Sequence, residues 1–393
     1  MIRFDYPFTV REIVLLSVAG AFFLVQLYYY LIIYMRPARY AKHAPKALND
    51  YAQQPSISVI VYARNENGNL EKNLPILLNQ NYGQYEVIVI NDGFTDESDT
   101  VLLRFEKEYP NLYHTFIPEE SKYLSRRKLS LTLGIKAAKY DTLFFIEASC
   151  RPMSADWLAT MAGNYDEDTM ILLGFCAYTT NKGLLHKLIS YDNLLSGVQY
   201  ISSALSGHPY SGNGGNLSYR KQLFFANKGF SHSLSLHAGD DDLFVNQTAT
   251  RTNTRVGYSP AGITEMEPAE CYAAWKDIKI ARASTQSHYR GWQLAFYRTE
   301  TISAVMFLLS IAAMIADGLL YNPFMIAAAA LMYIALYATK VNVTNKLSLL
   351  LRQKKTSGWL PFLEIIRIII NVYIRIYRAF KGKRDYTFTF GNK

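Results

Sequence analysis

The residues best suited to chemistry are three consecutive carboxylates, Asp240, Asp241 and Asp242, which follow a glycine and precede an apolar run. Adjacent carboxylates repel one another, so at least one of them should bind a proton more tightly than an isolated aspartate. Raised proton affinity suits a general base that removes a proton from a hydroxyl group. The competing interpretation is a capping and turn cluster at the start of a helix, and the three residues could divide both roles.

A glycine-rich segment, residues 207–219, stands shortly before this run. Glycines let the backbone approach a ligand closely, and asparagine amides can hydrogen-bond hydroxyl groups. A lone glycine-rich loop is weak evidence, so its position just before the carboxylates is what gives it value. The residues of this segment that could contact a ligand are Gly212, Asn213, Gly214, Gly215 and Asn216.

The elements that must position these residues have the pattern of a sheet with alternating helices. Short apolar strands are predicted at residues 57–62, 85–91, 142–146 and 170–175, with a helix over residues 129–139. The spacing of the first two strands fits a helical crossover, so the pattern predicts an open α/β sheet. Ligands of such sheets bind at the carboxyl ends of the strands. Polar segments stand at these ends: residues 63–66 (ARNE), 91–96 (NDGFTD) and 147–150 (EASC).

Taken in this order, the strand ends resemble those of glycosyltransferase family 2. That family has a first strand ending in Asn-Glu, a second ending in Asp-Asp-Gly-Ser-x-Asp and a later one ending in Asp-x-Asp. The stretches GNGGNLSYR and GDDDLF resemble its acceptor loop and its catalytic-base motif. The resemblance covers residues 55–290, and five motifs in one order argue against a chance match. It implies a GT-A-like, nucleotide-sugar-binding α/β domain and an inverting transfer.

The resemblance assigns donor-binding roles to the strand ends. Asp92 would accept a hydrogen bond from the nucleotide base, although it could instead close a turn with Asp96. Residues 63–66 would form the other wall of the base pocket, although the acid at position 66 also suits a helix N-terminus. One of the basic residues 126–128 would face the nucleotide, unless they form a solvated cluster. The nucleotide-sugar candidates are Ala63, Asn65, Glu66, Asp92, Lys128, Glu147 and Arg282.

Residues 147–149 depart from the family's Asp-x-Asp motif, in which two carboxylates share a divalent cation on the donor diphosphate. The two positions are Glu147 and Ser149 in this chain. Mg²⁺ and Mn²⁺ prefer anionic oxygen ligands, so the serine should weaken a metal site. Three explanations stay open. Glu147 could hold the metal with residues 240–242 or the substrate, Arg and Lys side chains could neutralise the diphosphate, or catalysis could be lost.

Two further assignments depend on how the motifs are aligned. Aligning the carboxylate run on Leu243 selects Asp240 as the catalytic base, whereas aligning it on the preceding glycine favours Asp241. The family's last motif, Gln-x-x-Arg-Trp, corresponds to residues 279–283, which keep only the arginine. Arg282 is therefore the candidate for a diphosphate contact, with an ordinary juxtamembrane cation as the alternative.

Long apolar segments flank the sheet on both sides. Residues 13–35 carry no charge, and at about 1.5 Å per residue they can cross a hydrocarbon core of about 30 Å. A cleaved signal peptide fits less well, because no small-residue cleavage site follows. Residues 301–320 and 324–339 predict a helical hairpin that turns at residues 321–323. Residues 360–380 predict an amphipathic helix that lies in the interface or packs its polar stripe against the domain, rather than spanning the membrane.

Basic residues favour one orientation of the chain. Four follow the first apolar segment closely, so the positive-inside tendency places the N-terminus outside and the central domain in the cytosol. We expect a multi-pass protein of the plasma (inner) membrane. Its predicted parts are a transmembrane helix with a basic linker (1–50), a cytosolic GT-A-like domain (51–298), a transmembrane hairpin (299–340) and an interfacial helix with a basic tail (341–393).

The composition excludes several other classes of protein. The net charge of +9 could indicate nucleic-acid binding, but the basic residues cluster beside the apolar segments, where anionic lipid headgroups explain them. Three widely spaced cysteines without a CxxC pair indicate neither a disulfide framework nor a zinc site. The basic clusters are Arg36, Arg39, Lys42 and Lys46, and Lys381, Lys383 and Arg384.

The sequence therefore predicts an inverting glycosyltransferase that moves a sugar from a nucleotide-sugar, expected to be a UDP-sugar, to a lipid-linked or membrane-proximal saccharide. The expected partners are this donor, this acceptor and membrane lipids, without nucleic acid, and a divalent cation (Mg²⁺ or Mn²⁺) is an open question. One rival is a scaffold or binding protein that has lost turnover, which Ser149 and Ala283 favour. The other is a processive polysaccharide synthase, although three or four membrane helices enclose a pore poorly.

Overall fold

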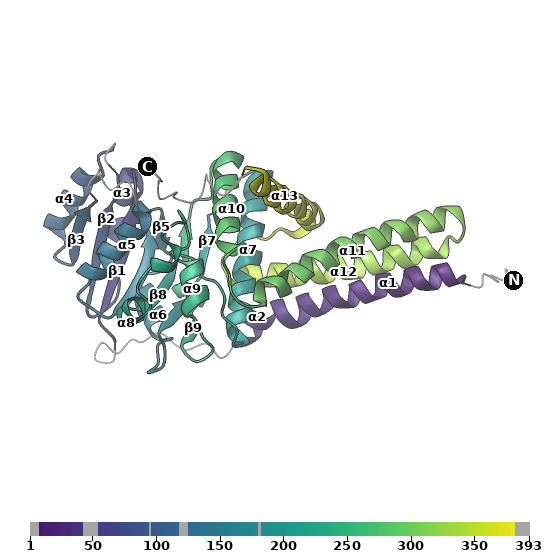
Figure 1. Ribbon diagram of the computed structural model, residues 1–393, viewed down its shortest axis with the longest axis horizontal. Helices are drawn as coiled ribbons and strands as arrows, with labels where there is room; N and C mark the ends of the chain where they lie inside the picture. The colour runs from purple at the N-terminus through teal and green to yellow at the C-terminus, as the bar shows by residue number, and fades with distance from the viewer. Residues whose placement is uncertain (1–7, 42–53, 94–95, 118–124, 180–181, 382–393) are drawn as a thin grey trace, which may run out of the picture.

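The computed structural model describes residues 8–41, 54–93, 96–117, 125–179 and 182–381. These residues form an α/β domain and a bundle of three long helices that projects from one side of the domain (Figure 1). The basic residues Lys42, Lys46, Lys383 and Arg384 lie outside the described residues.

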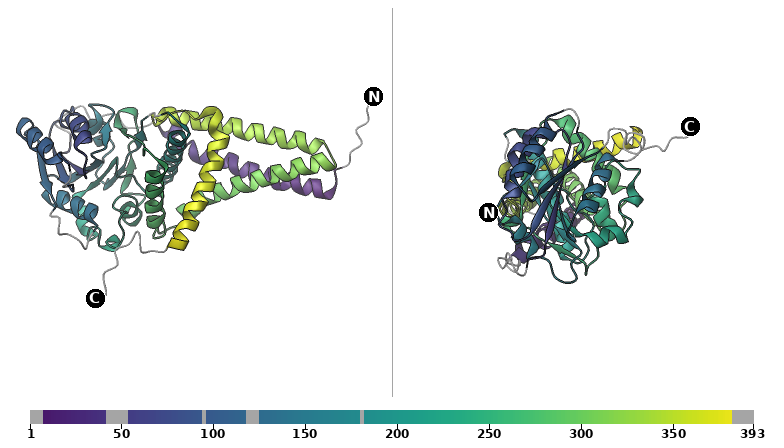
Figure 2. Two further views of the ribbon diagram at one scale, coloured as in Figure 1. Left: turned by 90° about the horizontal axis from the view of Figure 1, so that it is seen from above. Right: turned by 90° about the vertical axis from the view of Figure 1, so that its left-hand side faces the viewer.

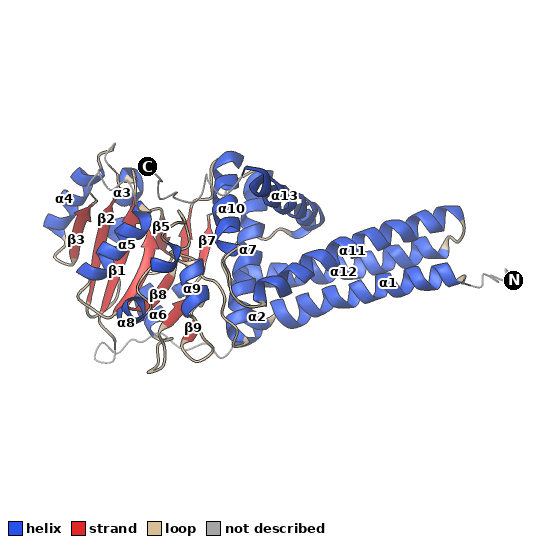
Figure 3. Ribbon diagram, viewed as in Figure 1, coloured by secondary structure: helices blue, strands red, loops and turns tan. Residues whose placement is uncertain are grey.

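The domain is built on a seven-stranded sheet (Figure 3), whose strands in spatial order are β3 (Leu112–Phe116), β2 (Tyr85–Asn91), β1 (Ile57–Ala63), β4 (Thr142–Glu147), β8 (Leu217–Arg220), β6 (Ile171–Leu173) and β9 (Thr254–Val256). The first four of these strands are parallel, because helices carry the chain back to the same edge each time. β8 runs antiparallel to both β4 and β6. The last four residues of the GNGGNLSYR stretch, Leu217–Arg220, are thus not part of a loop but form strand β8 inside the sheet.

Both faces of the sheet are covered by helices, which explains why β1 and β2 are continuously apolar instead of alternating. Val59 of β1 belongs to the apolar cluster on one face, and the next residue, Ile60, belongs to the cluster on the other. The first face carries α3 (Asn67–Leu78), α4 (Ser98–Glu108) and α6 (Trp157–Ala162). The second carries α5 (Arg126–Ala137), α7 (Leu184–Leu205), α8 (Lys221–Ala226) and α9 (Asp242–Thr248).

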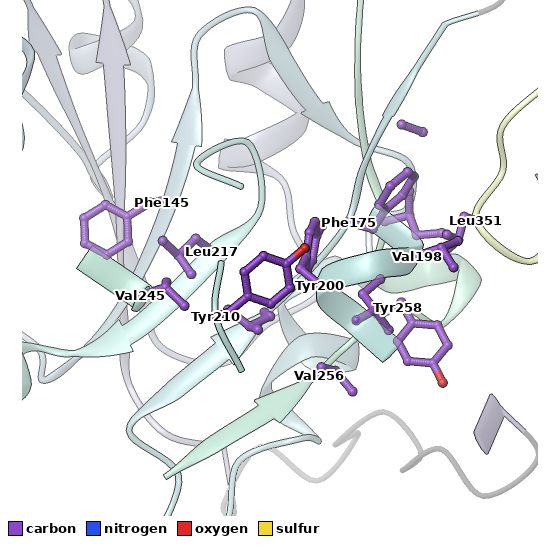
Figure 4. Close-up of a cluster of buried hydrophobic side chains, with 14 of the residues drawn as sticks. Phe145, Phe175, Val198, Tyr200, Tyr210, Leu217, Val245, Val256, Tyr258 and Leu351 are labelled. Atoms are coloured by element: carbon purple, nitrogen blue, oxygen red, sulfur yellow. The ribbon is translucent and has the colours of Figure 1, made fainter. Parts of the chain in front are cut away.

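The apolar cluster on the second face continues from the sheet toward the bundle of long helices. Figure 4 shows Phe145 of β4, Leu217 of β8 and Val245 of α9 at one end, and Val198 of α7 near Leu351 at the other. Domain and helices therefore share one continuous core.

A three-stranded sheet in the order β5-β10-β7 lies beside the main sheet. The chain turns from β4 directly into β5 (Cys150–Pro152), so Glu147 ends β4 and Ser149 lies in the turn. The other two strands are β7 (Cys176–Tyr178) and β10 (Thr264–Met266), and α10 (Tyr272–Gln286) follows β10.

Three segments of the described chain are helical, long and apolar enough to cross a membrane: Val10–Tyr40, Gln293–Leu320 and Phe324–Leu350. The first combines α1 (Val10–Leu27), a π-helical stretch (Tyr28–Tyr34) and α2 (Arg36–Tyr40); the others are α11 and α12. Large apolar side chains such as Leu24, Leu309 and Leu331 are exposed on the bundle. An exposed apolar surface of this kind suits contact with lipid.

The hairpin of α11 and α12 turns where the sequence predicted, but both helices are longer than expected. α11 begins before residue 299, and α12 continues past residue 340 to Leu350. Lys340 therefore lies inside α12 instead of at its end. It is 2% exposed and forms an ion pair of 2.6 Å with Glu364.

The last helix, α13 (Leu360–Lys381), is not among the segments apolar enough to span. Figure 2 shows α13 running across the bundle at its domain end. Its polar side chains face inward, where Arg367 pairs with Asp192 of α7 and Arg378 donates to the carbonyl oxygen of Ala283. Apolar side chains such as Phe362, Ile369 and Phe380 are exposed. α13 is thus amphipathic, with its polar stripe against the domain.

Candidate active site

A small pocket forms where the ends of β1 and β4 approach the glycine-rich loop and the start of α9. β1 and β4 are neighbouring parallel strands, so their carboxyl ends lie side by side. The loop is tied to α9, because the backbone N–H of Gly214 donates to Oδ2 of Asp241 at 2.8 Å. The lining residues include Tyr62, Arg127, Glu147, Gly214, Asp240 and Asp241.

Arg127 joins carboxylates from two of these segments. The sequence placed the basic residues 126–128 before a helix, and the structure places them in the first turn of α5. The guanidinium of Arg127 donates to Oε1 of Glu147 at 2.8 Å and to Oδ2 of Asp240 at 2.9 Å. Burial disfavours its charge, but the attraction of Asp240 and Glu147 raises the pKa of Arg127 well above its ordinary value. Arg127 therefore remains a cation between the two carboxylates.

The consecutive aspartates have different environments. Asp240 is 5% exposed and pairs with Arg127. Asp241 is half-buried and is the N-cap of α9, where its Oδ1 accepts from the backbone N–H of Asp242 at 2.6 Å. Both candidate bases therefore line the pocket. Asp241 caps α9 and is also partly exposed to solvent.

The sequence assigned no separate role to Asp242. In the structure it is buried against the end of α10 and the residues that follow this helix. Its Oδ2 accepts from Thr285 Oγ1 at 2.5 Å and from the hydroxyl group of Tyr289 at 2.8 Å. Burial, followed by the negative charge of Asp241, raises the pKa of Asp242 to about 7. Repulsion within the run predicted one raised pKa, but only the fold determines which carboxylate is buried.

Asp92 lies at the end of β2 with its carboxylate already bonded within the protein. It accepts from Arg126 Nε at 2.6 Å and from the hydroxyl group of Tyr62 at 2.9 Å. Its backbone N–H donates to the carbonyl oxygen of Ala63 at 2.8 Å. The donor candidates Ala63 and Asp92 are therefore adjacent, and the Asp92 side chain is fully buried.

Asn65 and Glu66 follow β1 in the loop that leads into α3. Asn65 has a left-handed backbone with φ of 54° and packs against Gly93, where an added Cβ would lie 2.4 Å from Asn65 Oδ1. Glu66 is at the N-cap of α3 without a capping hydrogen bond, and its Oε2 accepts from Asn69 at 2.5 Å. Burial raises the pKa of Glu66. These residues stand beside Asp92 at the same edge of the sheet.

The expectation that Lys128 contacts the nucleotide is wrong. Its ammonium group is 1% exposed and donates to the carbonyl oxygens of Ser233, Leu236 and Ala238. An ammonium group has three protons, so no donor remains for a ligand. Burial lowers the pKa of Lys128 to about 8. Lys128 instead fixes the segment that leads into the aspartate run.

Asn216 is also a structural residue and not an acceptor contact. Its side chain is fully buried, and its Nδ2 donates to the carbonyl oxygens of Phe175 at 3.0 Å and Gly262 at 2.9 Å. Gly212, Gly214 and Gly215 are buried as well, which leaves Asn213 as the half-buried member of the predicted acceptor loop.

The residues at positions 147–149 do not provide a two-carboxylate metal site. Glu147 supplies one carboxylate and Ser149 only a neutral hydroxyl group, while Glu147 and Asp240 share the guanidinium of Arg127. Over the described residues, no group of three His, Cys, Asp or Glu side chains could hold a metal ion. This donor set fits a guanidinium better than a divalent cation.

Arg282 lies beside the aspartate run and lines a second cavity of about 160 Å³. Burial disfavours its charge, but the attraction of Asp241 and Asp242 raises the pKa of Arg282 above its ordinary value. Tyr289, which bonds Asp242, lines the same cavity. This cavity lies between α7, α10, α11 and α13.

The sequence model described as glycosyl transferase family 2 matches residues 58–225, which contain the strand ends and the glycine-rich loop. The chain carries a family 2 glycosyltransferase domain. Within this domain lie Asp92, Arg127 and Glu147, whereas the aspartate run follows it.

Two curated glycosyltransferases are similar to this chain over short segments. A β-monoglucosyldiacylglycerol synthase from Nostoc sp. is 35% identical over 83 residues, which are 21% of this chain and 16% of that protein. Glycosyltransferase AglE from Haloferax volcanii is 29% identical over 106 residues, 26% of this chain and 33% of that protein. The alignments thus span a third or less of each relative.

The fold is similar to that of a solved glycosyltransferase. The mannosyltransferase PcManGT from Pyrobaculum calidifontis, in complex with GDP-Man and Mn²⁺, has a TM-score of 0.58 and 16% identity. The match covers 91% of this chain and 99% of that one. The open sheet of the family 2 domain is therefore of the GT-A type.

Proposed function

We propose that the protein is an inverting glycosyltransferase that moves a sugar from a nucleotide-sugar to an acceptor held at the membrane. The observation that carries the proposal is the pocket at the ends of β1 and β4, where Glu147, Asp240 and Asp241 meet the glycine-rich loop. Ligands of open α/β sheets bind at this edge. The family 2 domain supports the same class of reaction.

Asp241 is the proposed base. Asp240 is buried and neutralised by Arg127, whereas Asp241 is half-buried and is held in place by Gly214. The acceptor hydroxyl oxygen attacks the anomeric carbon of the donor sugar while its proton passes to the Asp241 carboxylate. The bond from that carbon to the diphosphate oxygen breaks, and its electron pair leaves with the nucleoside diphosphate. Attack from the side opposite the leaving group inverts the configuration.

Arg282 is the proposed partner of the leaving diphosphate. It lies beside Asp241 and Asp242 and stays charged, so it can stabilise the negative charge that develops as the bond breaks. At the end of β1, the exposed Asn65 and the half-buried Glu66 are the proposed contacts to the nucleotide base, whereas the fully buried Asp92 holds Arg126 and Tyr62 beside them.

The acceptor is proposed to be linked to a lipid, with the domain on the cytosolic side of the membrane. Three helices long and apolar enough to span the bilayer join the domain directly, which keeps the active site near the headgroups. The name of the Nostoc relative describes a glucosyl group on diacylglycerol, which agrees with a lipid acceptor.

The test is turnover of a panel of UDP- and GDP-sugars by the full-length protein in membranes, with and without chelator. We expect Asp241→Asn to lower kcat by about 100-fold or more, the usual loss for a general base. The matched control is Asp277→Asn, which changes an exposed aspartate of α10. NMR of the product gives the anomeric configuration and so checks inversion.

Each outcome of this experiment has a distinct meaning. Loss of turnover in Asp240→Asn but not in Asp241→Asn transfers the base to Asp240. Turnover that tolerates both substitutions contradicts the base assignment altogether. Nucleotide-sugar binding without turnover of any donor favours the rival, a binding protein with the same fold.

A further inference from the structure

The cavity at Arg282 has a strongly basic lining. Five cationic side chains line it, from three helices, against one carboxylate, that of Asp192 on α7. α10 contributes Lys279 and Arg282, α11 contributes Arg298, and α13 contributes Arg367 and Arg375. Such an excess of positive charge in one cavity favours an anionic ligand.

The carboxylate of Asp192 neutralises only part of this charge. It accepts from Lys279 Nζ at 2.8 Å and from Arg367 Nε at 3.0 Å. Arg298 has a buried Nε without a hydrogen-bond partner in the described part of the chain. A buried guanidinium N–H without an acceptor costs free energy, so this donor is suited to receive one from a ligand.

Arg375 lies near Arg298 on the facing helix and is exposed to solvent. Burial of part of its side chain, together with the positive charges of Arg298 and Arg367, lowers the pKa of Arg375. A planar guanidinium binds phosphate oxygens in pairs, so an anion between Arg298 and Arg375 would offset their mutual repulsion.

The position of the cavity indicates that the anion belongs to a membrane lipid. α13 runs across the bundle at its domain end (Figure 2). Ile369, Val372 and Ile376 are exposed on its apolar face. A helix with this distribution lies at the level of the lipid headgroups. The inner end of the cavity reaches Tyr289, which bonds Asp242 next to the proposed base.

We propose that this cavity binds the phosphate or diphosphate group of the lipid acceptor, through Arg298 and Arg375. The inference rests on the proposed function, because it takes the acceptor to be a membrane lipid. The anionic group is held at the interface by the two arginines, and the acceptor hydroxyl group extends along the cavity toward Arg282 and Tyr289, which lie next to the aspartate run. The acceptor is therefore an anionic lipid, which differs from the neutral diacylglycerol in the name of the Nostoc relative.

The test compares phosphatidic acid with diacylglycerol of the same acyl chains, as fluorescent lipids bound to the full-length protein in an uncharged detergent. We expect the wild type to bind the phosphate-bearing lipid about tenfold more tightly, or about 1.4 kcal/mol. Arg298→Gln and Arg375→Gln should each remove most of this preference. Arg352→Gln, which changes an exposed arginine between α12 and α13 outside the cavity, should retain it.

Equal affinity for the two lipids, or an equal loss in Arg352→Gln, overturns the proposal. Displacement of phosphatidic acid by the same concentration of inorganic phosphate would assign the site to free phosphate instead of a lipid. Because Arg375 is exposed, its substitution should leave the fold intact even where Arg298→Gln does not. Lipid preference without sugar transfer contradicts only the proposed function, whereas transfer to neutral lipids without this preference contradicts only the present inference.

Discussion

Asp240, Asp241 and Asp242 are chemically identical and consecutive, yet each one faces a different element. Asp240 points to Arg127 on α5, Asp241 caps α9 and meets the loop at Gly214, and Asp242 is buried beside Thr285. Their environments therefore differ. Asp240 pairs with a cation, Asp241 is partly accessible to solvent, and Asp242 favours its protonated form. This division separates the proposed chemistry of Asp241 from the structural work of its neighbours.

The raised pKa of Asp242 predicts a specific dependence of stability on pH. Its pKa in the folded protein is about 7, against 3.8 for an ordinary aspartate, because burial and the charge of Asp241 disfavour the ionised form. The protonated side chain therefore adds stability below about pH 4, and this contribution is lost as the pH rises toward 7. Relative to Asp242→Asn, the wild type should lose on the order of 5 °C in melting temperature across this range.

Thermal unfolding of both proteins in an uncharged detergent, from pH 4 to pH 8, measures this difference. The asparagine variant has nearly the same volume and cannot ionise, so it controls for all other titrating groups. Melting temperatures that run parallel over the whole range would show that Asp242 does not ionise in this window.

At the scale of elements, the strands and the turn of the helical hairpin could be predicted because each depends on a local sequence pattern. Continuous apolar runs bounded by turn residues predicted β1, β2 and β4 to within one residue, and Tyr321, Asn322 and Pro323 predicted the turn between α11 and α12. Burial on both faces of a parallel sheet requires such runs, so the signal is strong.

The parts that escaped prediction depend on contacts between distant segments. β8 pairs with β4 across more than 70 residues of chain, and the sequence of Leu217–Arg220 does not indicate which strand it pairs with. Lys128 and Asn216 have residue types that suit ligand binding, but carbonyl oxygens from remote loops use their donors. Asp242 and Tyr289 form a hydrogen bond because α10 packs against α9. For the candidate site, the sequence therefore located the edge of the sheet but not each side chain's partner.

Asp192 is one of the residues that attach α13 to the domain, and its ion pairs predict the effect of removing its charge. It pairs with Lys279 of α10 and Arg367 of α13, whose attraction outweighs burial and lowers the pKa of Asp192. Asp192→Asn leaves two buried cations uncompensated, which typically costs about 3–5 kcal/mol. We expect α13 to separate from α7 and α10 while the sheet stays folded.

Hydrogen–deuterium exchange of the full-length protein measures this separation directly. Amide protection should fall across α13 in Asp192→Asn and stay unchanged in β1 and β2. Asp277→Asn removes an exposed carboxylate from α10 and serves as the control. A uniform loss of protection over the whole domain would contradict a local attachment role.

At the scale of the whole molecule, the arrangement of the helices limits how the protein can sit in a bilayer. The bundle of α1, α11 and α12 projects from the domain (Figure 1), and α13 crosses it where the two parts meet. The turn at Tyr321 lies at the end of the bundle away from the domain, and Arg11 pairs with Asp317 at that same end. If the bundle spans the membrane, the domain and this turn are on opposite sides.

This geometry makes the orientation testable with the chain's own cysteines. Cys271 on the domain is exposed, whereas Cys150 and Cys176 are buried, so an impermeant maleimide should react with Cys271 alone in the native protein. With the domain in the cytosol, intact cells should leave Cys271 unlabelled and inverted vesicles should label it. In a Cys271→Ser background, Tyr321→Cys should show the reverse pattern, because Tyr321 is 62% exposed at the opposite end of the bundle. Labelling of both sites from the same side would contradict a spanning bundle, and labelling of Cys271 in intact cells would reverse the orientation.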